Sequence, residues 1–163
     1  RVGIAVRKME KKFNEILSSS DKDLYILRLS TVYGAPSISG VVRDLVDKIK
    51  ITEENALLKI NGSSRTQRNF LHIDFIIEVI SHILNSNKKV GFTIANIASN
   101  EHNSVFDLIN SIKYFMKKHV EVEFLNEDQS NYRLVHNESF KVGVSSQSIR
   151  LADGIERLLK IIK

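Results

Sequence analysis

The chain has no cysteine and no tryptophan, and it has a single proline among its 163 residues. Without cysteine, disulfide bonds, thiolate nucleophiles and cysteine-ligated metals are excluded. No apolar run approaches the roughly 18 residues that a membrane-spanning helix requires, and no signal-peptide pattern opens the sequence. The five histidines show no His-x-x-x-His or His-x-His spacing that would suggest a metal site. These absences favour a cytoplasmic domain with no membrane segment and no metal.

The residues that are present have the balance of a globular domain, with 42% hydrophobic and 26% charged residues. The formal net charge of +5 raises the question of a nucleic-acid ligand. The basic residues, however, are spread along the chain and interleaved with acids, as on a solvated surface. A basic balance also suits an anionic ligand such as a diphosphate. We therefore expect no nucleic-acid partner.

Apolar periodicity predicts helices that alternate with short strands. The expected helices cover residues 3–17, 41–49, 74–84, 104–116 and 151–162, and the expected strands cover 24–27, 57–60, 70–73, 92–98 and 122–124. We expect Asp74 to cap the helix that follows it. Ser104 and Asp107 have the spacing of a capping box. The alternation indicates the α/β class.

Several short motifs follow one another in a fixed order. Residues 27–36 (LRLSTVYGAP) look like the pattern LRxxNVYGP, and residues 61–74 (NGSSRTQRNFLHID) resemble GDGxQxRDFxHVDD. Further matches lie at residues 39–44, 95–99, 104–105 and 154–156. Together they resemble the C-terminal half of an extended short-chain dehydrogenase/reductase of the NAD-dependent sugar-nucleotide epimerase/dehydratase family.

The resemblance implies an α/β fold: the C-terminal part of a Rossmann-like NAD(P)-binding fold plus the small substrate-binding α/β subdomain. Residues 1–163 would form a single incomplete domain. Residues 1–36 would be the last part of the Rossmann-like sheet, with the helix that is catalytic in the family and the strand after it. Residues 37–163 would be mostly substrate-binding subdomain, with residues 70–98 returning to the sheet.

The resemblance also implies where a nucleotide sugar would bind. Burial of a diphosphate demands cationic donors, and the planar fork of arginine suits phosphate oxygens better than lysine does. Arg68 and Arg133 stand where the family has diphosphate-binding arginines, although the acid and lysine expected after Arg133 are missing. Thr31 replaces the family's substrate-contacting asparagine, and Val32 stands at a cofactor-contacting position. Position alone favours Arg68 as a surface arginine paired with an acid, and the resemblance reverses that interpretation; Arg65 is interpreted as solvated.

The family's reaction machinery is missing from this sequence. The family transfers hydride to and from NAD or NADP and uses a tyrosine in a Tyr-x-x-x-Lys motif as acid and base. Here Val2 and Val6 occupy those two positions, and no tyrosine precedes Tyr25. The seven glycines are scattered and form no Gly-rich phosphate loop. We therefore expect no catalytic residues and no cofactor for this chain alone, with NAD or NADP serving a full-length protein.

Two functions follow as expectations. The first is a substrate-binding half that binds a nucleoside-diphosphate sugar and is inactive alone. The alternative is a non-catalytic pseudoenzyme or dimerisation scaffold, which forms a homodimer or pairs with an intact relative through the apolar stripe of residues 3–17. His72, which alternates with apolar neighbours, is interpreted as a hydrogen-bonded core or edge histidine rather than a catalytic one.

Overall fold

The computed structural model describes the chain except for residues 1, 19, 37–38, 87–90, 126–147 and 163. Its helices and strands alternate in the order α1 (Val2–Leu17), β1 (Leu24–Leu29), β2 (Thr31–Tyr33), α2 (Val41–Ile51), β3 (Leu57–Ile60), β4 (Gln67–Arg68), β5 (Phe70–His72), α3 (Ile73–Asn85), β6 (Phe92–Ile97), β7 (Asn103–Ser104), α4 (Val105–Met116), β8 (Glu121–Phe124) and α5 (Leu151–Ile161). This alternation confirms the α/β class that the periodicity predicts.

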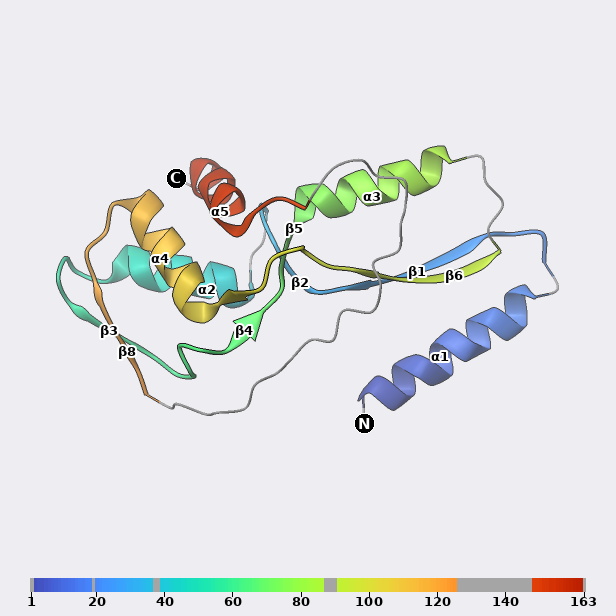
Figure 1. Cartoon of the computed structure of the whole chain (residues 1–163), viewed down its shortest axis with the longest axis horizontal. Coiled ribbons are helices and arrows are strands. Elements are labelled where there is room, and N and C mark those ends of the chain that lie inside the picture. Colours follow the sequence, from blue (N-terminus) through green and yellow to red (C-terminus); the bar gives the residue numbers. More distant parts are fainter. Residues whose placement is uncertain (1, 19, 37–38, 87–90, 126–147, 163) are drawn as a thin grey trace.

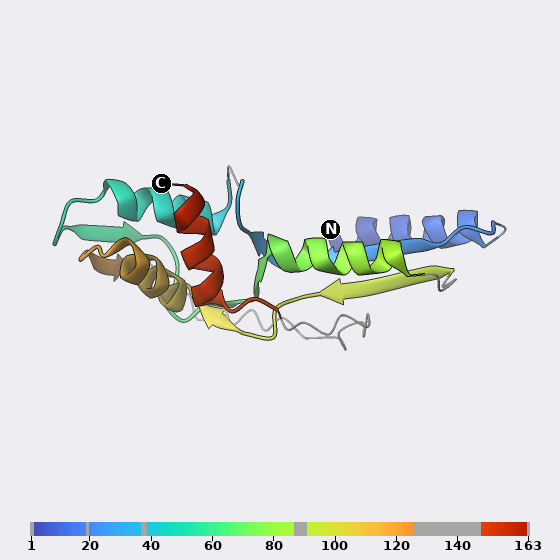
Figure 2. The same cartoon turned by 90° about the horizontal axis from the view of Figure 1, so that it is seen from above.

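The described strands form four two-stranded pairs. The molecule has two lobes, and each lobe contains one of the longer pairs (Figure 1). In one lobe β1 and β6 run parallel, with α3 on one face and α1 on the other (Figures 1 and 2). In the other lobe β3 and β8 run parallel beside α2, α4 and α5. The short pairs β2–β5 and β4–β7 lie between the lobes.

Each lobe has its own hydrophobic core. In the β1–β6 lobe, Leu71, Ile76 and Ala95 are buried between α3 and the strands. The larger core of the other lobe is built from the inner faces of its three helices, on which apolar residues recur at helical spacing. Its members from these helices are Val42, Leu45, Val46, Ile49, Leu108, Ile109, Ile112, Leu151, Ile155 and Leu158.

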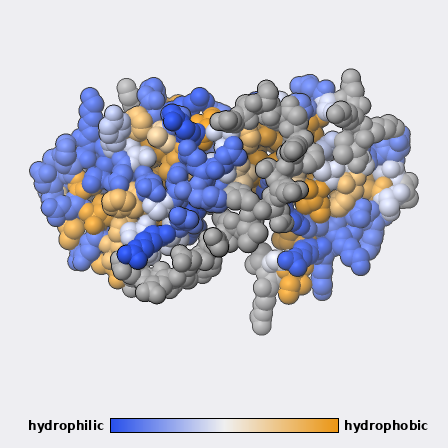
Figure 3. All heavy atoms as spheres, viewed as in Figure 1, coloured by the Kyte–Doolittle hydropathy of each residue, from blue (hydrophilic) through white to orange (hydrophobic). Residues whose placement is uncertain are grey.

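Helix α1 leaves large apolar side chains exposed. Ile4 is 63% exposed, Met9 51% and Phe13 43%, and Figure 3 shows hydrophobic surface on both lobes. The helix is tied to β1 by a forked ion pair, in which Arg28 Nε donates to Glu10 Oε1 at 2.8 Å and Arg28 Nη2 donates to Glu10 Oε2 at 2.6 Å. The hydrogen bonds from Arg28 hold the pKa of the Glu10 carboxyl below its usual value.

The lobes meet where α5 crosses the β2–β5 pair. The rings of Tyr33 and His72 stand edge to face, with centroids 5.1 Å apart, and Tyr33 Oη donates to the carbonyl of Leu151 at 3.4 Å. A Cβ on Gly154 would collide with the Tyr33 hydroxyl and lie 2.9 Å from Cδ2 of His72. Only glycine at position 154 therefore allows the helix to approach these rings. Burial raises the pKa of the Tyr33 hydroxyl, which keeps it neutral.

The prediction that Asp74 caps α3 is wrong, because His72 takes that role. His72 is 4% exposed, and its Nδ1 accepts a hydrogen bond from the Asp74 backbone N–H at 3.2 Å. The neutral ring must then carry its proton on Nε2, which is buried and has no hydrogen-bond partner among the described residues. Asp74 instead accepts from Arg157 of α5 at 3.1 Å. Burial lowers the pKa of His72. The nearby Asp74 carboxylate favours the protonated ring and offsets only part of this decrease.

We expect Gly154→Ala to destabilise the fold. Alanine normally stabilises a helix interior by about 1 kcal/mol relative to glycine, but here overpacking against Tyr33 and His72 should cost about 1–3 kcal/mol. Chemical denaturation of the two proteins measures the change. Gly3→Ala in α1 is the matched control, since nothing lies within 4 Å of its added Cβ. An unfolding free energy that rises in both variants would contradict the close approach.

We also expect the stability to depend on pH through His72. Its folded pKa lies below the ordinary value of 6.5, so the folded state binds fewer protons than the unfolded state. The contribution is complete above about pH 6.5 and is lost as the pH falls through the lower, folded pKa. His72→Asn keeps a side-chain oxygen to cap α3 but cannot titrate. Denaturation at several pH values between 7 and 5 should show a slope in the parent protein that the variant lacks; equal slopes would refute the assignment.

Candidate functional site

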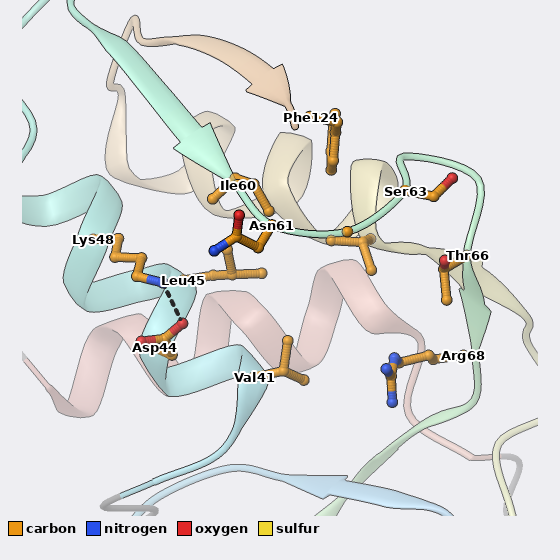
Figure 4. Close-up of a pocket in the computed structure, with 12 residues that line it drawn as sticks. Val41, Asp44, Leu45, Lys48, Ile60, Asn61, Ser63, Thr66, Arg68 and Phe124 are labelled. Carbon is orange, nitrogen blue, oxygen red and sulfur yellow. Dashed lines mark ion pairs between the residues drawn. The ribbon is translucent and has the colours of Figure 1, made fainter. Parts of the chain in front are cut away.

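A pocket of about 170 Å³ opens in the lobe that contains α2, β3 and β8 (Figure 4). It lies where β3 and β8 end, beside the loop that leads from β3 to β4. Its wall combines apolar side chains with polar ones from the same elements. The residues that line it are Val41, Asp44, Leu45, Lys48, Ile60, Asn61, Gly62, Ser63, Thr66, Arg68, Val105 and Phe124.

The topology explains why the pocket forms at this place. Ile60 and Phe124 are register partners at the carboxyl ends of the parallel strands β3 and β8. In open α/β sheets ligands bind in the crevice beyond the carboxyl ends of the strands. Val41 and Leu45 supply the facing apolar wall, because residues four apart lie on the same side of α2. The result is an apolar slot with polar groups around its mouth.

Arg68 is the residue that the sequence singled out and that the structure brings to this pocket (Figure 4). Its side chain is exposed, and it forms no ion pair or hydrogen bond with another described residue. Among the described residues, Arg68 is therefore not paired with an acid, in contrast to the interpretation from its position alone. An arginine without a carboxylate partner at the edge of an apolar slot can bind an anion bidentately.

Asn69, which sequence reasoning missed, holds the backbone beside Arg68. Its side chain is 1% exposed, donates to the carbonyls of Ser99 at 2.6 Å and Glu101 at 2.9 Å, and accepts from the Ser99 N–H at 2.7 Å. The carboxylate of Glu101 in turn accepts from the Leu151 N–H at 3.0 Å. Because the amide saturates three backbone groups, the strand that carries Arg68 is fixed to the chain after β6. The sequence alone gave no signal for this role, because Asn69 ends the polar run of residues 61–69.

A second polar group in the pocket was not foreseen from the sequence. Lys48 and Asp44, one turn apart on α2, form an ion pair with Nζ and Oδ2 at 2.8 Å. Asn61 follows β3 and lies near this pair in Figure 4. The spacing of Asp44 and Lys48 is an ordinary helix-surface pattern, so nothing in the sequence alone distinguishes it from a solvated pair.

The other predicted site residues lie elsewhere. Thr31 is not among the residues that line the pocket; it pairs with Phe70 of β5, and its backbone N–H donates to the carbonyl of Asn69 at 3.1 Å. Val32 is 40% exposed. Arg133 lies outside the described residues. The roles assigned to Thr31, Val32, Arg68 and Arg133 stay predictions.

The described residues contain neither a cluster of metal ligands nor a membrane-spanning helix. Within them, no three histidine, aspartate or glutamate side chains gather closely enough to hold an ion. In the same part of the chain, no helix combines the length and the apolar character needed to cross a bilayer.

Comparison with known proteins places this geometry in a known fold. No protein-family model and no curated protein matches the chain. Among solved structures, UDP-glucuronic acid 4-epimerase from Bacillus cereus, in complex with UDP-glucuronic acid and NAD, is 22% identical with a TM-score of 0.74; the match covers 93% of this chain and 49% of that one.

Two further structures agree with this match. UDP-glucose 4-epimerase from Thermotoga maritima, with UDP-glucose, is 17% identical with a TM-score of 0.76, over 98% of this chain and 52% of that one. UDP-N-acetylglucosamine 4-epimerase from Methanobrevibacter ruminantium, in complex with UDP-N-acetylmuramic acid, is 15% identical with a TM-score of 0.74, over 96% and 51%. The chain thus spans about half the length of these enzymes, and it has the Rossmann-like fold of that half, as its motifs predict.

Proposed function

We propose that this chain is the substrate-binding half of a nucleotide-sugar epimerase or dehydratase relative and that it binds a nucleoside-diphosphate sugar in the pocket at Arg68. The observation that carries the proposal is an arginine that has no acidic partner among the described residues and lies beside an apolar slot, at the carboxyl ends of two parallel strands. Three of the solved structures with this fold hold UDP-sugars. A nucleotide sugar complements this pocket, because its flat base can fill the apolar slot and its phosphates can bind the arginine.

The same proposal divides the chain into the parts that the resemblance implies. Residues 1–36 and 70–98 would belong to the Rossmann-like sheet, which the parallel pair β1–β6 supports. The remaining residues would form the substrate-binding subdomain around the pocket. Thr31 and Arg133 would reach the sugar or the diphosphate from either side. A ligand of this class fits the predicted cytoplasmic location.

We propose that this chain alone holds no dinucleotide cofactor. A pyrophosphate is held by a Gly-rich turn that opens a helix, and the sequence has no such turn. Between β1 and β2, two residues before the Val32 that was expected to contact a cofactor, the buried Ser30 hydroxyl has no hydrogen-bond partner within the described part of the chain. One orphaned hydroxyl does not form a cradle for NAD or NADP. With neither that cradle nor the Tyr-x-x-x-Lys pair, we propose that the chain alone performs no hydride transfer.

Arg68→Gln should weaken the binding of UDP-glucose. The loss of a charge-assisted bidentate contact, worth about 1.5–3 kcal/mol, corresponds to a rise in Kd of about tenfold or more. Isothermal titration calorimetry at two salt concentrations measures this effect, and the salt dependence should weaken in the variant. Arg65→Gln is the matched control, because Arg65 is exposed three residues away and does not line the pocket. Equal effects of the two substitutions would contradict the assignment.

A second candidate function, a pairing or scaffold module, is favoured by helix α1. Its exposed apolar residues include Ile4, Met9 and Phe13, and an amphipathic helix of a globular protein normally buries such a stripe. A second copy of this chain or an intact relative would cover it. Pairing and ligand binding use different elements, so they are compatible.

If α1 mediates pairing, Phe13→Ser should weaken the association, so the average molecular mass at a given concentration should fall. Removal of a large apolar side chain from an interface costs about 1.5–3 kcal/mol, which should raise the dissociation constant at least tenfold. Analytical ultracentrifugation over a range of concentrations measures it. Phe106→Ser in α4, where Phe106 is 48% exposed, is the control that should leave the mass unchanged. A parent chain that is monomeric alone and with an intact relative would eliminate this function.

A further inference from the structure

Strand β1 has one edge that is paired and one that is open. The N–H of Leu24 donates to the carbonyl of Gly91 at 2.8 Å, and the parallel register with β6 continues from there without interruption. The even-numbered residues of β1 therefore turn their backbone N–H and C=O groups toward β6. Because these groups alternate along a strand, Leu27 and Leu29 turn theirs to the other edge. No strand pairs with that edge among the described residues.

The sequence of β1 does not protect this edge from another strand. Natural sheets protect open edges with proline, with unpaired charges or with bulges. The strand (LYILRL) contains no proline and no acid, and its one cation is engaged, since Arg28 forms the forked ion pair with Glu10. Leu29, near the end of the strand, is 44% exposed. The edge thus offers backbone donors and acceptors together with apolar side chains, which are the features that an added strand uses.

Helix α1 lies beside the same edge. It runs along β1 on the side away from β6 (Figure 2), and the Arg28–Glu10 pair fixes it there. Stable protein interfaces usually bury roughly 1,200–2,000 Å², which is more than the edge of a six-residue strand can supply. The exposed apolar side chains of α1, which include Met9 and Ile16, would provide the additional area.

We propose that the open edge of β1 pairs with β1 of a second copy of this chain, antiparallel and across a two-fold axis. This inference rests on the second candidate function, pairing, and names its partner; it is independent of nucleotide binding. A two-fold axis matches one edge with itself, so the two copies agree in length and in the spacing of donors and acceptors. With Leu27 on the axis, Arg28 would face Ile26 of the second copy rather than another arginine.

The pairing would also complete an unusually small sheet. An isolated pair of strands is marginal, and three or more strands are normally needed for a stable sheet. Within the described part of the chain, β1 and β6 form such an isolated pair. Two copies joined through β1 would form one larger sheet, with β6 at both ends and with α1 and α3 of each copy on its faces. A second copy therefore satisfies the backbone and enlarges the sheet in one step.

The test combines the solution mass with hydrogen exchange at single amides. As the concentration rises, the average mass measured by analytical ultracentrifugation should approach that of a dimer. Over the same range, NMR should show the amides of Leu27 and Leu29 exchanging at least about tenfold more slowly. Leu29→Pro removes an N–H that points away from β6, so it should raise the dissociation constant of the dimer at least about tenfold.

Ile94→Pro is the matched control. By the same alternation its N–H points to the outer edge of β6, and its side chain is 37% exposed, so the dissociation constant should not change. Leu29→Lys and Ile94→Lys repeat the comparison without altering the backbone, because a lysine keeps its N–H and blocks an open edge by its charge. Circular dichroism of each variant verifies that it is folded.

The outcomes separate this inference from the functions proposed above. Equal dissociation constants for the Leu29 and Ile94 variants would overturn edge pairing, even if Phe13→Ser showed that α1 mediates association. Slow exchange of Leu27 and Leu29 at every concentration would mean that the chain covers its own edge, and a parent chain that stays monomeric would exclude a second copy. Calorimetry with Arg68→Gln tests nucleotide binding separately, so that function can stand when this inference fails.

Discussion

The side chain of Asn69 is the interaction on which the rest of the structure depends. Its amide bonds three backbone groups of Ser99 and Glu101, and its backbone carbonyl accepts from Thr31. Through Glu101 the network reaches the N–H of Leu151, where α5 begins. One buried amide therefore connects β2, the chain after β6 and the last helix. The same hydrogen bonds hold the backbone next to Arg68, so the constraint that joins these segments also places the residue that carries the cation.

The two ends of the pocket have different physical origins. Arg68 is positioned by a buried hydrogen-bond network, and it meets no carboxylate among the described residues, so its charge stays available to an anion. Asp44 and Lys48 neutralise each other on α2, so they offer directional hydrogen bonds rather than net charge. Between them lie the apolar residues Ile60 and Phe124 at the ends of β3 and β8. A charged end and an apolar middle are the features on which the proposed nucleotide ligand rests.

Local rules predicted much of this fold from the sequence. Helical spacing of Val42, Leu45 and Ile49 predicted α2, and the Ser104–Asp107 capping box is present as expected, with the Asp107 N–H donating to Ser104 Oγ at 3.1 Å. The α3 cap was mispredicted, because Asp74 pairs with Arg157 across the lobe junction and His72 is free to cap in its place. Arg68 was found through a motif, whereas Asp44 could not be: only the tertiary approach of α2 to the end of β3 distinguishes it from Asp47.

We expect a nucleotide to bind at the ends of β3 and β8, although the sequence has no Gly-rich dinucleotide cradle. The most direct measurement is an isotope-edited NMR titration of the chain with UDP, dTDP-glucose and NAD. The two nucleoside diphosphates should shift the amide signals of residues 60–68 and of the start of α2, and NAD should leave the signals around Ser30 and Val32 unmoved. A folded chain whose pocket signals ignore both nucleotides, or whose β1 end responds to NAD, would contradict it.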